Sequence, residues 1–408
     1  MMTTPNMFTN RESSTSTMPN LPFRLIRILF LLSFMLLALS LTIGEPTRAA
    51  DIIREVCPPV GIQTGGPGFE PGGIILTAFD NSAIWVYNID SGRRYPLPET
   101  TPCAGNCRLS SDARWITYFN ALTRAFNKMR LDGTQRTFVN AYASDIDWWA
   151  DGTFLVWTPG HNAYLQAEGS DEREYLNVEG VISVQPGGRW GVLVEHNGDG
   201  FIRDVINLEL RDMDGISDGR LALGVDLAYF NAHAWSPDGT WLAYVAPTLR
   251  GARVTGSEIY GVRPGAGASQ QWTDLTSVYG RARVNGLSVG ELSWSPDSTR
   301  IAFWVTPLIG PDPAANTGSA MIHVLDVATG AVTQYCGFTT TEHTPNPPRL
   351  LWSPDGSALA FSGNVPEDDK GYMLLALDLE SGIFTMLSEG VFPTFGSADL
   401  VAWGLPPG

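Results

Sequence analysis

The sequence is poor in charged residues and histidine, and each shortage narrows the choice of function. Charged residues make up only 17% of the chain and hydrophobic residues 44%, which excludes a disordered protein of high charge. The five histidines are scattered, and no close pair has the spacing of a zinc site. No glycine-rich loop lies between a strand and a helix, so nothing in the sequence favours nucleotide binding.

Long apolar runs are also absent, except near the N-terminus. Arg24 and Arg27 precede an apolar run at 28–43, and Ala49 follows at the distance expected for signal-peptidase cleavage. A membrane helix needs roughly 20 apolar residues, so this run is short for a span. Residues 1–49 are predicted to be a cleaved signal peptide, with a retained N-terminal signal anchor as the alternative. We therefore expect an exported protein, periplasmic or extracellular, that contacts membrane only through this segment if it is uncleaved.

Acidic residues outnumber basic ones throughout the exported part. The chain has 26 basic and 42 acidic residues, and residues 1–49 hold four Arg and two Glu. The remainder then carries 22 basic and 40 acidic residues, a formal net charge of −18. Because nucleic-acid affinity depends on neutralising phosphates, this balance excludes nucleic acid as a partner. It suits cations or a basic partner surface instead.

Cysteine is scarce, but its number is even. Four cysteines in an exported chain favour disulfides over a metal site. Cys103 and Cys107 could close a small loop, and Cys57 and Cys336 could join the start of the domain to a late repeat. Free thiols are the alternative to these two pairs.

Glycine and proline, by contrast, are abundant, and they recur in one pattern. Its clearest copies are Trp-Ser-Pro-Asp-Gly at 235–239, Trp-Ser-Pro-Asp-Ser at 294–298 and Trp-Ser-Pro-Asp-Gly at 352–356, each followed by a short apolar stretch. Pro presets the first turn residue, Asp hydrogen-bonds turn amides and Gly accepts positive φ. The large apolar Trp is expected to wedge between neighbouring repeats. This chemistry predicts an architectural role for Trp235, Asp238, Trp294, Asp297, Trp352 and Asp355.

With its weaker copies, the pattern covers the chain from about residue 72 to its end. The turn residue recurs at 72, 112, 151, 187, 238, 297 and 355, a period close to that of propeller blades with four strands each. The sequence at 400–406 is similar to the first strand of a repeat, and the repeat near residue 72 begins at its second strand. We therefore expect an all-β fold, a single β-propeller of about seven four-stranded blades at 72–408, preceded by a linker at 50–71. The C-terminal strand would pair with the first blade and close the ring.

The repeat resembles those of the TolB-type and WD-like β-propellers, whose hallmark is Trp-Ser-Pro-Asp-Gly before a short apolar strand. Three copies match closely and the others in outline. The resemblance implies the propeller architecture, which serves as an interaction platform in some proteins and precedes hydrolase domains in others.

The loops predicted on the two faces of the propeller differ in length. The Pro-Asp-Gly turns and the later Asp-x-x-x-Gly turns share one face and stay short. The excess length gathers on the other face, in loops predicted at 196–204, 247–257, 307–319 and 363–371 within blades and at 336–349 between them. Loops that grow on one face of a rigid scaffold are where binding usually sits. The candidate binding residues on that long-loop face are Arg250, Arg253, Asp312, Asn316, His343 and Asp368.

A calcium site is a second candidate, at 195–206. Glu195, Asn197 and Asp199 place oxygen ligands at the first, third and fifth positions, followed by Gly. The twelfth position is Ile206 rather than the closing Glu, and Asn-Gly-Asp-Gly is also a strong hairpin former. Calcium is the one cofactor that the sequence suggests, and a plain hairpin is the alternative.

These observations favour a non-catalytic exported propeller that binds a protein, a peptide or a glycan of the cell envelope through the long-loop face. The alternative is a propeller enzyme, a glycan lyase or hydrolase, with a central pocket on the same face. The sequence assigns no catalytic residue, because residues that meet at a propeller axis are far apart in the chain.

Overall fold

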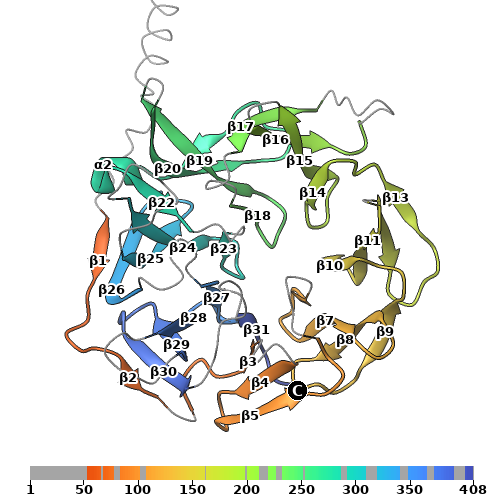
Figure 1. Cartoon of the computed structure of the whole chain (residues 1–408), viewed down its shortest axis with the longest axis horizontal. Helices are drawn as coiled ribbons and strands as arrows, with labels where there is room; N and C mark the ends of the chain where they lie inside the picture. Colours follow the sequence, from red (N-terminus) through yellow and green to blue (C-terminus); the bar gives the residue numbers. More distant parts are fainter. Residues whose placement is uncertain are drawn as a thin grey trace, which may run out of the picture. The chain divides into compact units, whose positions relative to one another are not determined.

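The described part of the chain forms a ring of seven β-sheets in the computed structural model (Figure 1). The structure describes residues 53–65, 68–77, 83–101, 107–160, 162–197, 200–210, 219–226, 232–250, 253–285, 292–308, 319–340, 348–364, 372–389 and 400–407. They belong to one compact unit, Asp51–Gly408. Each sheet is a blade whose strands follow one another outward from the ring axis, which confirms the all-β propeller and the count of seven.

Blades 1 to 4 are antiparallel sheets of four strands, in which the first strand named is the innermost. Blade 1 consists of β31 (Leu400–Gly404), β3 (Ile74–Thr77), β4 (Ile84–Asn88) and β5 (Arg93–Leu97). Blade 2 consists of β6 (Arg108–Leu109), β7 (Trp115–Asn120), β8 (Ala125–Arg130) and β9 (Thr137–Asn140). Blade 3 consists of β10 (Asp145–Ala150), β11 (Thr153–Thr158), β12 (Asn162–Ala167) and β13 (Glu174–Leu176). Blade 4 consists of β14 (Val181–Val184), β15 (Trp190–Asn197), β16 (Gly200–Asn207) and β17 (Leu221–Asp226).

Blades 5 to 7 contain the best copies of the repeat and carry additional elements. Blade 5 consists of β18 (His233–Trp235), β19 (Leu242–Arg250), β20 (Arg253–Val262) and β21 (Gln270–Gln271). Blade 6 consists of β23 (Ser293–Trp294), β24 (Arg300–Pro307), β25 (Ala320–Asp326) and β26 (Val332–Thr340), with β22 (Ala282–Val284) also paired to β24. Blade 7 consists of β27 (Leu351–Trp352), β28 (Ala358–Asn364), β29 (Tyr372–Asp378) and β30 (Phe384–Glu389). A short helix, α2 (Leu275–Tyr279), lies between blades 5 and 6.

The C-terminal strand closes the ring as the sequence predicts. β31 pairs antiparallel with β3, with Ile75 opposite Trp403. Strands from opposite ends of the chain therefore share blade 1, and the indole of Trp403 donates a hydrogen bond to the carbonyl of Gly72 (2.9 Å). This pairing leaves no gap between the last blade and the first.

A segment near the N-terminus lies along the outer rim of blades 6 and 7, and we call residues 53–65 the strap (Figure 1). Its two strands, β1 (Arg54–Val56) and β2 (Gln63–Thr64), pair in parallel with β26 and β30. Val56 and Ile62 pack against the hydrophobic core shared by blades 6, 7 and 1. The strap lies within 50–71, the stretch that the sequence suggests as a linker.

The turns of the repeat have the backbone that their residues favour. Gly239 has a φ of +69°, in the left-handed region that glycine enters at no steric cost. Ser298 takes the corresponding place in the next copy with a φ of 60°. A different need applies at Gly261, where a Cβ would lie 1.8 Å from the ring of Trp272, so the close approach of that indole requires glycine.

The predicted N-terminal signal segment, 1–49, lies outside the described residues. Within the part of the chain that the structure describes, no helix has the length and apolarity to cross a membrane.

Candidate functional site

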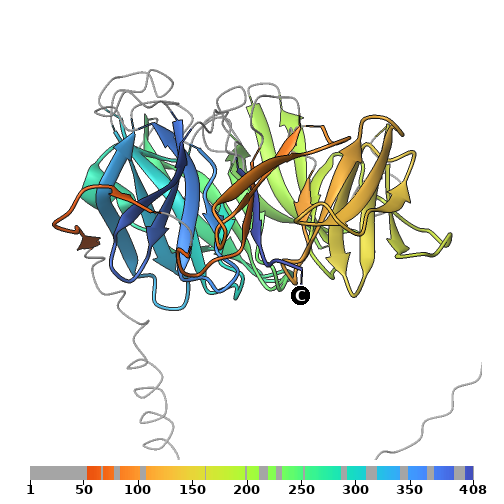
Figure 2. The same ribbon diagram turned by 90° about the horizontal axis from the view of Figure 1, so that it is seen from below.

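The connections of the blades gather on two opposite faces. The turn face carries the links from first to second strand and from third to fourth, such as 236–241 and 326–331. The loop face carries the links from second to third strand and from blade to blade, such as 121–124, 141–144, 177–180 and 272–281. The strands run between these faces in the side view, with the C-terminus at the turn face (Figure 2).

On the turn face, the aspartates of the repeat hold their turns closed. Asp238 accepts hydrogen bonds from the Ser236 hydroxyl (2.5 Å), the Thr240 amide and the Thr240 hydroxyl. Asp297 and Asp355 accept the same three bonds in their own turns. Burial tends to raise the pKa of each carboxyl, but these hydrogen bonds outweigh it and the net pKa is lowered. The aspartates are therefore committed to the architecture.

The tryptophans of the repeat lie between blades. Trp294 donates its indole N–H to the carbonyl of Ala234 in blade 5 (3.1 Å), and Trp352 donates to Ser293 in blade 6 (2.8 Å). Trp235 is buried in a cluster with Leu242 and Tyr244. A buried indole needs a partner for its N–H, and the neighbouring backbone supplies it at Trp294 and Trp352.

Two of the predicted binding residues occupy paired positions. Arg250 and Arg253 face one another in register at the end of the long hairpin β19–β20, on the loop face. The stretch 247–257, which the sequence suggests as a loop, is mostly the continuation of these strands. Asp312, Asn316, His343 and Asp368 lie outside the described residues, and their part in binding stays a prediction.

The predicted calcium residues lie at the end of the hairpin β15–β16. Asn197 pairs with Gly200, which leaves two residues between them, and Asp199 lies outside the described residues. The Glu195 carboxylate forms an ion pair with Arg220, which also pairs with the buried Asp204. Burial raises the pKa of Asp204, and the bond from Arg220 opposes that shift. A calcium ion at this hairpin would therefore compete with Arg220 for Glu195.

Exposed apolar side chains are concentrated on the loop face. Leu122, Tyr142 and Val278 lie in its connections, and Ile182 lies at the start of β14, which begins at that face. On the described part of the turn face there is one large exposed apolar residue, Leu210, which follows β16. The remaining three, Val60, Phe138 and Tyr175, lie on the outer rim. Apolar groups left in water on one face are typical of a binding surface.

A charged cluster joins the innermost strands of blades 2 and 3. Arg108 donates from Nε to Asp147 (2.5 Å) and from Nη2 to Asp145 (3.2 Å), and the indole of Trp157 donates to the second oxygen of Asp147 (3.2 Å). These side chains are about one-third exposed or less. Because both carboxylates are paired with one guanidinium, the cluster joins the two blades rather than offering an unpaired acid and base.

The helix α2 is held to blade 5 by a carboxylate that the sequence does not single out. Glu258, fully buried on β20, accepts hydrogen bonds from the Thr273 hydroxyl (2.7 Å), the Leu275 amide (2.7 Å) and the Thr276 amide (2.8 Å). The amides at a helix start have no partner within the helix, so a buried carboxylate satisfies them well. It fixes the loop-face connection that carries Val278.

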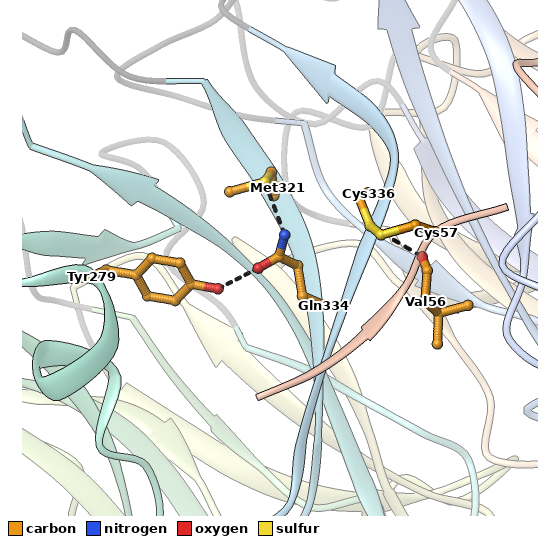
Figure 3. Close-up of a disulfide and its surroundings, with 6 residues drawn as sticks. All are labelled: Val56, Cys57, Tyr279, Met321, Gln334 and Cys336. Atoms are coloured by element: carbon orange, nitrogen blue, oxygen red, sulfur yellow. Dashed lines mark hydrogen bonds between the residues drawn. A yellow bond between two sulfur atoms is a disulfide. The ribbon is translucent and has the colours of Figure 1, made fainter. Parts of the chain in front are cut away.

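The other end of α2 is held to blade 6. The hydroxyl of Tyr279 lies 2.7 Å from Nε2 of His323 and 2.5 Å from Oε1 of Gln334, whose amide nitrogen contacts the sulfur of Met321 (Figure 3). Burial lowers the pKa of His323 to about 4 and raises that of Tyr279 to about 12, with Glu55 adding to the latter shift. A sequence signal is hard to find for this network, since Tyr279 and Gln334 are 55 positions apart.

The strap is joined covalently to blade 6. Cys57 forms a disulfide with Cys336 on β26, beside the Tyr279 network (Figure 3). This confirms one of the two predicted pairs. Cys107 is also disulfide-bonded, whereas Cys103 lies outside the described residues. Glu55 and the two sulfurs form the one group of three potential metal ligands among the described residues, but the disulfide occupies both sulfurs.

Comparison with known proteins supports the fold alone. No protein-family model matches the chain, and no curated protein matches it in sequence. Similar solved structures include a puromycin-hydrolysing peptidase of Mycobacterium tuberculosis, with 13% identity, a TM-score of 0.48, and coverage of 85% of this chain and 57% of that one. A TolB-like protein of Agrobacterium tumefaciens has 13% identity and a TM-score of 0.38, with 81% and 96% covered. The oligogalacturonate lyase of Vibrio parahaemolyticus has 13% identity and a TM-score of 0.44, with 81% and 91% covered.

The fold and the repeat define the class of the chain: it is a seven-bladed β-propeller with antiparallel four-stranded blades. A TolB-like protein is among its structural neighbours. The chain spans little more than half the length of the puromycin-hydrolysing peptidases that it matches.

Proposed function

We propose that this propeller is a non-catalytic binding module that acts after export and recognises a protein, peptide or glycan of the cell envelope through its loop face. The observation that carries the proposal is the distribution of exposed apolar side chains. Four of them, Leu122, Tyr142, Ile182 and Val278, lie on the loop face, against Leu210 alone on the described turn face. Leaving such groups in water costs free energy, which a partner that covers them recovers.

The scaffold beneath this face is rigid, as a binding surface requires. Glu258 and Tyr279 fix the two ends of α2 to blades 5 and 6, so Val278 is presented in a defined position. Positioning a contact before binding reduces the entropy lost on association. Arg250 and Arg253 are paired in register at the end of β19–β20 on the same face.

The disulfide supports the proposed compartment. Such bonds persist in oxidising environments, which include the periplasm and the extracellular space. Cys57–Cys336 agrees with an exported protein, whether residues 1–49 are removed or kept as an anchor.

Affinity capture from the envelope of the source cell tests the proposal. The baits are the full chain with a C-terminal tag, an Ile182→Ser/Val278→Ser double variant of the loop face, and a Leu210→Ser variant of the turn face as matched control. All three residues are exposed, so the variants should keep their stability within about 0.5 kcal/mol. We expect a ligand retained by the wild type and the control and lost by the double variant. A ligand that the double variant holds as well as the wild type would contradict the assignment of the face.

A further inference from the structure

The outer edge of blade 2 is open where other blades of the ring are protected. β9 ends its sheet in the described part of the chain, and its four residues, Thr-Phe-Val-Asn, include neither a charge nor a proline. Proteins usually protect such edges with charged residues, proline or a covering segment. The outer strand of blade 1, β5, contains Arg93, Arg94 and Pro96, and the outer strands of blades 6 and 7 are covered by the strap.

The strap shows how this fold accepts an extended segment at such an edge. β1 adds to β26 over three residues and β2 adds to β30 over two, both in parallel. β9 occupies the equivalent outermost position in blade 2 (Figure 1). A register shift in its pairing with β8 leaves Val139 in a bulge, which limits an added strand to a similarly short segment.

Exposed apolar side chains flank this edge. Phe138 on β9 itself is 63% exposed, Leu122 in the β7–β8 turn is 73% exposed, and Tyr142 just after β9 is 77% exposed. Single exposed apolar side chains are normal on a protein surface, but these three gather within one blade and the link that leaves it. They supply contacts for apolar side chains of an added strand.

The charge of blade 2 is opposite to that of the whole chain. Residues 107–140 contain six basic residues and two acidic ones, a net charge of +4, whereas residues 50–408 carry a net charge of −18. Carboxylates outside this stretch pair with three of the basic residues: Asp145 and Asp147 with Arg108, Glu168 with Lys128, and Glu99 with Arg136. Arg124 is exposed in the same turn as Leu122. A local positive field favours an acidic ligand and disfavours a basic one.

We propose that the edge of β9 binds a short, extended acidic peptide, which adds to blade 2 as a fifth strand. The peptide backbone pairs with β9, its apolar side chains contact Phe138, Leu122 and Tyr142, and its carboxylates are attracted to the basic residues of the blade. Main-chain pairing gives affinity in this mode of recognition, and alternate side chains give specificity. The proposal rests on the binding function above and specifies its ligand as an acidic extended segment of a partner protein.

The test measures the binding of synthetic peptides to the full chain. Each peptide carries a neutral fluorophore, and its binding is followed by fluorescence anisotropy at low salt. The first peptide is Glu-Val-Glu-Val-Glu-Val, and the second replaces Glu by Lys throughout. The third keeps the acidic sequence but carries N-methylated valines, which cannot donate main-chain hydrogen bonds. We expect the first peptide to bind at least about tenfold more tightly than either of the others. Equal binding of the N-methylated peptide would overturn strand addition, and equal binding of the basic peptide would overturn the acidic preference.

Variants locate the site. Phe138→Ser removes the apolar contact on β9, and Arg124→Glu reverses a charge beside it; both residues are exposed, so the fold should be kept. Each change should weaken binding of the acidic peptide by about tenfold. Arg93→Glu on the edge of β5 is the matched control and should change binding less than about twofold. An equal loss in the control would mean that the peptide responds to overall charge, which overturns the site.

The outcome can be separated from that of the proposed function. If the acidic peptide fails to bind while envelope capture still depends on Ile182 and Val278, the β9 site is wrong and the binding module stands. If the peptide binds and the capture fails, strand addition at β9 stands and the assignment of the loop-face ligand falls.

Discussion

The hydroxyl of Tyr279 lies 2.7 Å from Nε2 of the buried His323, although the two residues belong to a loop-face helix and to a blade strand. The imidazole also lies against the ring of Phe303, and its Nδ1 is 3.0 Å from the carbonyl of Met321. Both ring nitrogens of the buried His323 thus have a polar partner, and the hydrogen bond with Tyr279 links α2 to blade 6.

The number of available protons decides which groups donate hydrogen bonds in this network. A neutral imidazole carries one N–H, and the carbonyl of Met321 can only accept, so Nδ1 is the donor and Nε2 accepts from Tyr279. The same hydroxyl donates to Oε1 of Gln334 (2.5 Å), so the two acceptors share its single proton, while the amide nitrogen of Gln334 donates to the sulfur of Met321. Through Nδ1 of His323, the network reaches the backbone carbonyl of Met321 on β25.

The depressed pKa of His323 predicts a loss of stability in mild acid. Between about pH 6.5 and pH 4 the unfolded chain binds a proton at this histidine and the folded protein does not, so stability falls as the pH decreases through that window. The full effect is of the order of 3 kcal/mol. Urea unfolding from pH 7 to pH 4 should show this slope in the wild type and a reduced slope in His323→Gln. His196→Gln, at an exposed position on β15, is the matched control for the replacement of a histidine.

The disulfide of the strap should contribute strongly to stability. Cys57 and Cys336 are separated by 279 positions, and a bond that closes a long loop restricts the unfolded chain most. We expect a Cys57→Ser/Cys336→Ser variant to lose about 2–5 kcal/mol of unfolding free energy. Cys103→Ser/Cys107→Ser, which would open only a short loop, should lose less. Equal losses in the two variants would show that chain restriction is not the cause.

The aspartates of the repeat predict a further acid sensitivity at lower pH. The pKa values of Asp238, Asp297 and Asp355 are lowered in the fold, so their stabilising effect is present above about pH 4 and is lost as the pH falls through the folded pKa. A triple Asp→Asn variant should be less stable at neutral pH but should lose less stability between pH 4 and pH 2. A variant that keeps the wild-type dependence in that range would contradict the role of the carboxylates.

Removing the Glu258 carboxylate should loosen α2. Glu258→Gln keeps the size of the side chain but exchanges one acceptor oxygen for a donor that would face the amides of Leu275 and Thr276. We expect a loss of about 1–3 kcal/mol. Hydrogen exchange at 274–280 should increase more than in the strands of blade 5. Glu174→Gln, exposed on β13, is the control and should leave that exchange unchanged.

The architecture can be predicted from the sequence because its information is local and repeated. Each copy of the repeat marks the turn after a first strand, and the three close copies with the four weaker ones specify a ring of seven blades. The closing strand is also predictable, since the sequence at Leu400–Gly404 carries the apolar run and the Trp of a first strand, and the repeat near residue 72 begins at its second strand.

The strap and the α2 network cannot be predicted in the same way. β1 has the sequence Arg-Glu-Val, in which polar and apolar residues alternate no more than in a loop. Its partner β26 lies near the other end of the chain. Tyr279 and Glu258 belong to no motif, and their roles depend on contacts between blades that repeat spacing does not encode. The sequence predicts a loop at the end of the hairpin β19–β20 because Pro247 and the nearby glycines are residues typical of turns and loops, although the structure has strands there.

The strap also sets the order in which the molecule can be completed. Residues 53–65 are made before every blade, yet their partners on β26 and β30 are made about 280 and 320 residues later. At roughly 5–20 residues per second, the strap waits on the order of tens of seconds for a place to dock. The Cys57–Cys336 bond therefore joins the first described segment of the chain to blade 6, one of the last blades to be made.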